Sequence, residues 1–571
     1  MGDADPMNWG KRMSDDRALS ELLNAVAADW DLTHFSRRRF MKLAGTVGGL
    51  AVGGSTLAWL IEACGGSSTA ATNTNATLTM AVFQEPDTLD PSASGLITVG
   101  AISGCIFDHL IWDLPGHGSS PFYAGLASSW EATPDATSYT FHLRKDVKFH
   151  DGTPFNAQAV KFTFDHIVDP NTKSKSAAGA LGPYQDTTVV DDYTVKVNFK
   201  SPNAAFMNEV ATFSIVSPAA VQKFGADFGH NPVGTGPFKF KEYVVGQHVT
   251  VERNPDYNWG PQPLRTGPPQ IKEIVFRILA DPGARFNALQ TGEINLAPNI
   301  NPQDIQSIKS DPKFKVYNVD STGMPWNIMV NAQKAPTNDP LVRQALEFAT
   351  DQATIIKTLY FGLYKAADSV YTPITPGYDQ ATQAIYKYDK DKAGQLLDQA
   401  GWTKGSDGMR QKGGQKMKLN FINISGFGFD GISQLMQSQF KDVGIQVDIS
   451  DQSFPAVADA YNRGDQHLAD FFYYDVDPYF TRALFGGDQI AHGFNWEHYD
   501  NPDLTAQIDK ANATADNSQR ADLYKQVGKT IMEAAVIIPI YNSSGLFVGT
   551  SSIQGLAFTV NAFPLFHAVS M

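Results

Sequence analysis

Residues 417–449 read MKLNFINISGFGFDGISQLMQSQFKDVGIQVDI, and this stretch decides the fold class. Its two ends, residues 417–424 and 445–449, are apolar and rich in β-branched residues, which predicts two strands. Apolar residues recur at helical spacing between residues 431 and 443, which predicts a helix between the strands. A strand, a helix and a second strand make a β-α-β unit, so we expect a mixed α/β protein.

The segments before this unit carry further helix signals. Residues 341–360 predict a helix that is interrupted near Thr350 and Asp351. Asp389 predicts the start of another helix, because aspartate side chains cap helix N-termini. Gly401 predicts its end, since glycine tolerates the left-handed conformation in which many helices stop.

Alternating apolar and polar residues predict half-buried strands nearer the N-terminus. Residues 78–83 and 193–199 form two of them. Residues 139–143 and 147–149 are predicted to be the two arms of a hairpin. Asn156 is expected to cap a helix that follows the hairpin.

Length, charge and cysteine content exclude several classes of protein. The 571 residues suffice for three or more domains. Forty-five Lys and Arg against 59 Asp and Glu give a net charge of −14, which argues against a nucleic-acid partner. The two cysteines, Cys64 and Cys105, exclude a disulfide scaffold and a cysteine-rich zinc site. We expect Cys105 to act as a small buried hydrophobic residue.

The first 63 residues resemble a twin-arginine signal peptide, which exports folded proteins. The motif SRRRFMK at residues 36–42 precedes an uncharged stretch, residues 43–61. The sequence IEAC at residues 61–64 resembles a lipobox, which implies a lipid anchor on Cys64. A plain signal peptide and an uncleaved single span are the alternatives, and both leave the protein facing outward. Residues 64–77 are small and polar, as in a flexible tether.

Many short motifs follow one another in an order typical of one family. They are EPDTLDP at 85–91, LASSW at 126–130, YTFHLRK at 139–145, VKFHDGTP at 147–154, NPVGTGPF at 231–238, NPDY at 254–257, ALQTGE at 288–293, VRQAL at 342–346, YD at 388–389, AGW at 400–402 and IPIY at 538–541. Together they resemble the family 5 extracellular solute-binding proteins of ABC importers, the peptide- and nickel-binding group.

This resemblance implies a two-lobed periplasmic-binding-protein-like clamp of the class II type. The first lobe would comprise residues 78–112, 213–322 and 546–571, with an inserted subdomain at 113–212, and residues 323–545 would form the second lobe. Gly234 and Gly236 are expected in a tight turn where the lobes meet. The clamp would close on a solute at the periplasmic or outer face of the membrane and deliver it to an ABC permease.

In peptide-binding relatives, an aspartate within an Asp-x-x-Asp-Pro segment pairs with the α-ammonium of the ligand. Here Asp477 and Pro478 match, but Tyr474 replaces the first aspartate and Asp475 is the nearest carboxylate. Either Asp475 serves, or the ligand lacks a free amine. The candidate ligand-binding residues are Asp475, Asp477, Tyr474, Tyr473, Trp326, Asn327, Glu85, Phe83, Phe427 and Phe429.

Rival functions remain open. A binder of oligosaccharides or other non-peptide solutes would use the same aromatic segment, and a sensory receptor would use the same clamp to report a ligand. An enzyme is not expected, because the sequence has no His-Glu-x-x-His, Gly-x-Ser-x-Gly or Walker motif. We expect no cofactor and no metal site, and nothing in the sequence requires a homo-oligomer, so a monomer is expected.

Overall fold

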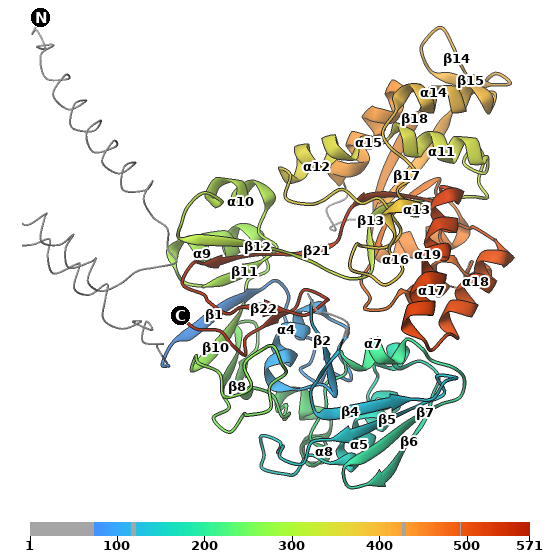
Figure 1. Ribbon diagram of the computed structural model, residues 1–571. Helices are drawn as coiled ribbons and strands as arrows, with labels where there is room; N and C mark the ends of the chain where they lie inside the picture. The colour runs from blue at the N-terminus through green and yellow to red at the C-terminus, as the bar shows by residue number, and fades with distance from the viewer. Residues whose placement is uncertain (1–73, 116–121, 425–429, 491–492) are drawn as a thin grey trace, which may run out of the picture. The chain divides into compact units, whose positions relative to one another are not determined.

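The computed structural model describes residues 74–115, 122–424, 430–490 and 493–571. They lie in one unit that spans Thr72–Met571. Three sheets, of seven, four and five strands, organise this unit, and helices pack around them (Figure 1). None of the helices in these residues is long and apolar enough to span a membrane.

The seven-stranded sheet joins strands from both ends of the described chain in the order β12-β21-β11-β1-β10-β9-β8. Strand β1 is parallel to β10 and β11, and the other pairs are antiparallel. The strands are β1 (Thr77–Val82), β8 (Phe238–Val244), β9 (His248–Arg253), β10 (Glu273–Ile278), β11 (Leu296–Pro298), β12 (Phe314–Asp320) and β21 (Ser544–Thr550). The helices are α4 (Ile97–Ile106), α8 (Pro218–Phe224), η2 (Gly225–His230), α9 (Pro282–Thr291) and α10 (Pro302–Ile308).

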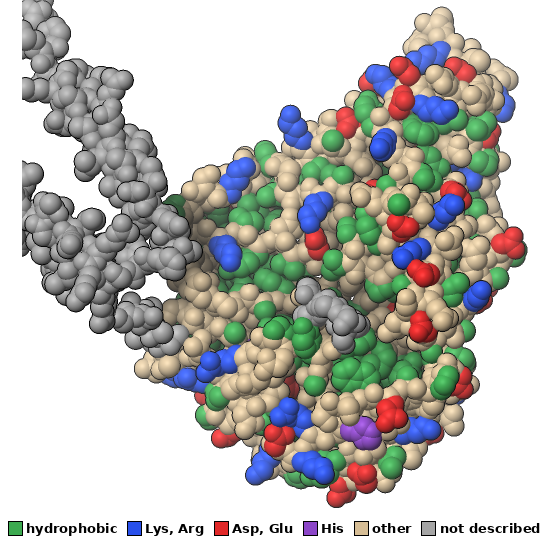
Figure 2. Space-filling model, in the orientation of Figure 1, with side chains coloured by type: hydrophobic (Ala, Val, Ile, Leu, Met, Phe, Trp, Pro, Cys, Tyr) green, Lys and Arg blue, Asp and Glu red, His purple; other side chains and the backbone are tan. Residues whose placement is uncertain are grey.

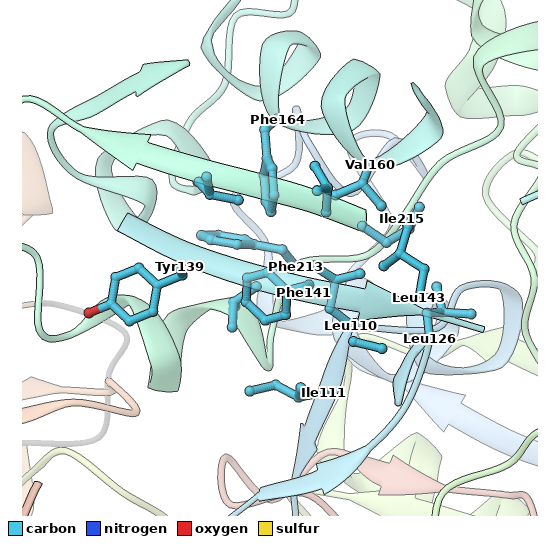
Figure 3. Close-up of a cluster of buried hydrophobic side chains, with 14 of the residues drawn as sticks. Leu110, Ile111, Leu126, Tyr139, Phe141, Leu143, Val160, Phe164, Phe213 and Ile215 are labelled. Carbon is cyan, nitrogen blue, oxygen red and sulfur yellow. The ribbon is translucent and has the colours of Figure 1, made fainter. Parts of the chain in front are cut away.

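The four-stranded sheet is antiparallel, in the order β4-β5-β7-β6. It comprises β4 (Ala127–Ala132), β5 (Ser138–Leu143), β6 (Tyr184–Asp191) and β7 (Thr194–Phe199), with helices α5 (Ala157–Val168), α6 (Ala177–Leu181) and α7 (Phe206–Val210). Val160 and Phe164 of α5 pack onto Phe141 and Leu143 of β5 (Figure 3). Strands β5 and β7 therefore bury alternate side chains.

The five-stranded sheet has the order β18-β17-β19-β13-β20. It comprises β13 (Met324–Val330), β17 (Lys418–Ile424), β18 (Gln446–Gln452), β19 (Leu468–Tyr473) and β20 (Ile537–Tyr541). Strands β17, β18 and β19 are parallel, while β13 is antiparallel to β19 and β20. The accompanying helices are α11 (Pro340–Ala349), α12 (Gln352–Tyr360), α13 (Gln380–Gln383), α14 (Lys390–Gln399), α15 (Asp430–Asp442) and α16 (Phe454–Arg463).

Shorter elements complete the described chain. Strands β2 (Ile111–Asp113) and β3 (Phe122–Ala124) pair, as do β22 (Ala557–Phe558) and β23 (Pro564–Leu565). Strands β14 (Thr403–Lys404), β15 (Arg410–Lys412) and β16 (Gln415–Lys416) form a small sheet. The remaining helices are η3 (Pro478–Phe480), α17 (Thr481–Phe485), η4 (Gly487–Gln489), α18 (Pro502–Asn512) and α19 (Asn517–Ala534).

Most of the local predictions are confirmed. Strand β17, helix α15 and strand β18 form the predicted parallel β-α-β unit. Asn156 caps α5, its side chain accepting a hydrogen bond from the Ala159 N–H. The predicted interruption separates α11 from α12, where Asp351 caps the second helix through the Thr354 N–H. Gly401 has a φ of +82° after α14, and Cys105 is 1% exposed.

Two predictions are wrong. Residues 147–149 do not pair with β5, whose neighbours are β4 and β7; Phe149 instead donates to the Thr153 carbonyl in a local turn. Gly234 and Gly236 are not needed for a left-handed turn, because neither has a positive φ. They allow close packing: a Cβ on Gly236 would lie 2.5 Å from the Cys105 carbonyl oxygen and 2.6 Å from the Ile106 carbonyl carbon.

Candidate functional site

The loop after strand β19 carries the two aspartates predicted from the sequence. Residues 474–477 connect β19 to η3. Asp477 is the N-cap of η3, and its Oδ1 accepts a hydrogen bond from the Tyr479 N–H at 2.8 Å. Pro478 occupies the first helical position, where a missing N–H costs nothing. The Asp-Pro pair therefore has a local structural role.

Asp477 is also half of a fully buried ion pair. Arg520 of α19 donates two hydrogen bonds to it, Nη1 to Oδ2 at 2.6 Å and Nη2 to Oδ1 at 2.5 Å. Asn208 of α7 donates a third, Nδ2 to Oδ2 at 2.5 Å. Burial opposes the charge of Arg520, but the adjacent carboxylate raises the pKa of the guanidinium above its usual value. The charge of Asp477 is thus neutralised by its own protein.

Asp475 and Glu209 form a pair of carboxyl groups beside this ion pair. Asp475 Oδ1 accepts a hydrogen bond from the Asp477 N–H at 3.1 Å, and the Glu209 carboxyl lies near enough to Asp475 for each group to affect the pKa of the other. Burial raises the pKa of Asp475 to about 7. Burial, followed by the charge of Asp475, raises the pKa of Glu209 well above its usual value. Burial therefore favours the protonated form of both carboxyl groups.

Three carboxyl groups and one guanidinium thus meet between α7, the 474–477 loop and α19. Arg520 pairs with Asp477, and no other Lys or Arg in the described part of the chain forms an ion pair with Asp475 or Glu209. With all three carboxyls ionised, the cluster would carry two uncompensated negative charges. Such a cluster favours an incoming cation.

Aromatic rings from three strands stack next to the same loop. The Trp326 ring of β13 lies between two others, 4.2 Å from Phe472 at an interplanar angle of 10° and 5.3 Å from Tyr541 at 15°. The Tyr474 side chain is 38% exposed and hydrogen-bonds the Trp326 and Ser543 side chains. Tyr473 packs on Phe480, with centroids 5.6 Å apart. Trp326 and Tyr474 are therefore brought together, as expected.

The other predicted site residues lie in more structural surroundings. Asn327 is fully buried in β13, where its Nδ2 donates to the Pro325 and Phe471 carbonyls at 2.9 and 3.0 Å. Glu85 Oε1 accepts hydrogen bonds from the Tyr243 hydroxyl at 3.0 Å and the Gly246 N–H at 2.6 Å. Phe83 follows β1 and is half-buried. The Asn327 amide nitrogen and the Glu85 carboxylate thus bond within the fold, whereas Asn327 Oδ1 is buried without a hydrogen-bond partner among the described residues.

A cavity of about 80 Å³ lies beside the carboxyl pair. Its wall includes Val476, between the two aspartates, and Ala211 and Thr212, which directly follow α7. Other lining residues come from α4, from β2 and from residues 559–565. Asp113 also lines it, and burial raises the pKa of this carboxyl to about 7. Asp113 is thus the acidic residue of the cavity lining, and neither Glu209 nor Asp475 belongs to it.

Some predictions lie outside the described residues, namely Phe427, Phe429, Cys64 and the signal segment. In the described part of the chain, no group of three or more His, Cys, Asp and Glu is placed to hold a metal ion. The face shown in Figure 2 carries interspersed acidic and basic side chains rather than one continuous basic patch.

Sequence reasoning missed Glu209, Asn208 and Arg520. Glu209 stands in the apolar segment FMNEV of α7, and a charged residue within an apolar run was the available signal. Arg520 stands among polar residues of α19, where a buried arginine has no local signature. The contact of Asn208 with Asp477 joins residues 269 positions apart.

Comparisons with known proteins agree with this architecture. Residues 121–491 match the model of the bacterial extracellular solute-binding proteins, family 5 Middle. The heme-binding protein A of Haemophilus influenzae is 28% identical over 485 residues, 80% of this chain and 85% of that protein. The dipeptide-binding protein of Escherichia coli is 29% identical over 456 residues, 75% of this chain and 82% of that protein.

Solved structures show the same fold. NikA from Brucella suis, in complex with Fe(III)-EDTA, matches with a TM-score of 0.76 at 24% identity, covering 87% of this chain and 99% of that one. The fold is the two-lobed α/β fold of periplasmic binding proteins.

Proposed function

Because this chain belongs to the bacterial extracellular solute-binding proteins of family 5, we propose that it captures short peptides and delivers them to the membrane permease of an ABC importer. Capture of this kind involves no covalent step. The ligand binds between two lobes, and contacts that improve in the closed state shift the population toward closure.

The peptide assignment rests on Asp475, whose carboxyl group forms no ion pair with a Lys or Arg of the described residues. This carboxyl is half-buried and accepts a hydrogen bond from the Asp477 N–H. Asp477 is already neutralised by Arg520. A peptide α-ammonium supplies the missing positive charge and three hydrogen-bond donors. Asp475 thereby takes the role that resemblance to peptide-binding relatives assigns to an aspartate of this loop.

The lobes of the clamp follow the sheets. The chain passes from β12 to β13 between Asp320 and Met324, and returns from β20 to β21 between Tyr541 and Ser544. These two crossings form the hinge. The first lobe comprises residues 78–112, 213–322 and 546–571, the inserted subdomain residues 113–212, and the second lobe residues 323–545.

The aromatic residues complete the ligand contacts. Tyr473 and Tyr474 offer flat faces to peptide planes or side chains, and Phe83, Phe427 and Phe429 belong to the same proposed set. Trp326, stacked between Phe472 and Tyr541, contributes its ring edge and supports Tyr474. Asn327, Glu85 and Asp477 hold the strands and loops that carry them, through the Asn327 Nδ2 and the Glu85 and Asp477 carboxylates.

Two alternatives share this fold. An oligosaccharide or another non-peptide solute would stack on Tyr474, which is 38% exposed, and leave Asp475 without an ammonium partner. A sensory receptor would use the same closure to signal to a membrane protein. Neither alternative includes catalysis, and the family consists of binding proteins.

The proposal places the protein outside the cytoplasmic membrane. Residues 1–63 act as a twin-arginine signal peptide, Cys64 carries a lipid anchor, and residues 64–77 tether the folded part. The protein works as a monomer next to its permease.

Native mass spectrometry tests the ligand class. Residues 72–571, purified without refolding, are expected to carry a series of peptide masses that disappear on denaturation. Asp475→Asn is expected to abolish this series, whereas Asp192→Asn, at an exposed turn, should keep it. A single non-peptide mass that survives Asp475→Asn would rule out the peptide assignment and favour the oligosaccharide or other solute.

A further inference from the structure

Asp113, the last residue of strand β2, brings a carboxyl group without a partner to the wall of the cavity of about 80 Å³. Its side chain is half-buried, and among the described residues its carboxyl accepts no hydrogen bond and forms no ion pair. Removing a carboxylate from water is costly, so such groups normally have a partner in the protein. A carboxyl group that lacks one and lines a cavity is available to a ligand.

The described part of the cavity wall contains no positive charge that could pair with Asp113. It includes neither lysine nor arginine. Its histidine, His109, is 8% exposed, and burial lowers the pKa of this ring to about 4. His567 packs edge-on against Trp112, with ring centroids 5.5 Å apart, and burial lowers its pKa to about 3. Both imidazoles are therefore neutral at pH 7, and neither serves as a counter-ion.

Large apolar side chains form much of the remaining wall. Trp112 comes from β2, Phe563 and Leu565 come from the C-terminal segment, and Val476 comes from the loop after β19. Lysine and arginine side chains fit such surroundings, because their methylene stems pack on apolar surface while their charged ends seek an anion. An apolar cavity with one unpaired carboxylate therefore matches a long, positively charged side chain better than a neutral or an acidic one.

The cavity also adjoins the proposed ligand site. Val476 lies between Asp475 and Asp477 in the second proposed lobe, whereas Trp112 belongs to the first. Residues of both lobes thus contribute to one wall. A ligand group held there would be enclosed when the clamp closes.

We propose that this cavity holds a positively charged side chain of the bound peptide and that Asp113 is its counter-ion. The inference rests on the proposed function, in which Asp475 binds the α-ammonium group that all free peptides share. Asp113 adds selectivity among peptides, because it pairs with a side chain. No covalent bond changes, and the cationic side chain donates hydrogen bonds to the Asp113 carboxylate.

The titration of Asp113 agrees with this role. In the protein without ligand, burial raises the pKa of Asp113 to about 7. A cation in the cavity would favour the ionised carboxylate and offset this effect of burial. The carboxylate is therefore stabilised by the ligand itself.

Isothermal titration calorimetry of the full chain tests the selectivity with arginine as the probe. Ala-Arg-Ala is compared with Ala-citrulline-Ala, and Arg-Ala-Ala with citrulline-Ala-Ala, because citrulline has nearly the shape of arginine without its charge. In at least one pair, the arginine peptide should bind about tenfold more tightly, as expected for a charge-assisted hydrogen bond. Both members of a pair carry the same α-ammonium group, so the contribution of Asp475 cancels.

Asp113→Asn keeps the size of the side chain and removes its charge. It should weaken binding of the arginine peptide until the two members of the pair bind within about twofold of each other, and leave the citrulline peptide unchanged. Asp113→Ser, a second neutral variant, should behave in the same way and serves if Asp113→Asn does not fold. Asp192→Asn is the control, because this aspartate lies at an exposed turn, and it should keep the tenfold preference.

The results separate the two proposals. Equal binding within both pairs by the wild type would overturn the cationic subsite and leave peptide capture intact. A preference for arginine that survives both neutral variants would overturn Asp113 as the counter-ion. Failure of the wild type to bind any of these peptides, or trialanine, would overturn both proposals.

Discussion

Arg520 of α19 donates two hydrogen bonds, of 2.6 and 2.5 Å, to the Asp477 carboxylate, and neither side chain is more than 3% exposed. The aspartate that best matches the family motif is thereby paired within the protein, and its neighbour Asp475 forms no ion pair with a Lys or Arg of the described residues. The ion pair also ties the 474–477 loop to the last long helix.

Arg520→Met should destabilise the protein by about 3–5 kcal/mol, because it leaves a buried carboxylate without its cation. Urea unfolding measures the loss. Adding Asp477→Asn should recover part of it, giving a coupling energy of about 2–3 kcal/mol. Strictly additive effects of the two substitutions would show that the pair contributes nothing jointly.

Gly236→Ala should destabilise the protein by about 2–3 kcal/mol, since the new Cβ would lie 2.5 Å from the Cys105 carbonyl oxygen. Gly179→Ala is the control, because no atom lies within 4 Å of its Cβ and alanine favours the helix in which it stands. Thermal unfolding should lower the Tm for the first variant alone. Equal Tm values would contradict the close packing at Gly236.

Asp108 should make stability fall as pH rises. It accepts hydrogen bonds from Thr235, Tyr257 and Trp259, each at 2.9 Å, yet burial raises its pKa from 3.8 to about 6. The folded state thus binds the proton more tightly than the unfolded state. The stability that this difference contributes is complete below about pH 4 and is lost as pH rises through 6.

The side chain introduced by Asp108→Asn cannot titrate. Between pH 4 and pH 7 the free energy of unfolding of the wild type should therefore fall by roughly 3 kcal/mol more than that of the variant. Urea unfolding at several pH values measures both slopes, with Asp192→Asn as a control that follows the wild type. Parallel curves for the wild type and Asp108→Asn would refute the raised pKa.

Trp326→Ala should lower stability by about 2–4 kcal/mol, because it removes the ring stacked between Phe472 and Tyr541. Trp326→Phe keeps a flat ring and should lose about half as much. Chemical unfolding gives the ranking, and a loss below 1 kcal/mol for the alanine variant would contradict a role in packing.

Local patterns predicted much of the fold. The β-α-β unit at residues 417–449, the Asn156 cap and the glycine after α14 depend on neighbours within a few positions, so the sequence contains their cause. The predicted hairpin at residues 139–149 failed because strand β5 finds its partners in β4 and β7, and pairing with β7 depends on packing across more than 40 residues.

The site was predictable only in part. Asp475, Asp477, Tyr474 and Trp326 were found through motif and composition, and the structure gathers them near one loop. Arg520 was not found because a buried arginine among polar residues has no local signature, and Glu209 was missed although a charged residue within an apolar run was an available signal.

The sequence by itself determined the fold class, the family resemblance and the loop that carries the acidic residues, because each of these depends on the spacing and type of residues close together in the chain. Only the tertiary structure decided which carboxylate is free. The charge of an aspartate depends on what lies within a few ångströms, and here α7 and α19, distant along the chain, bring Asn208, Glu209 and Arg520 against the two aspartates.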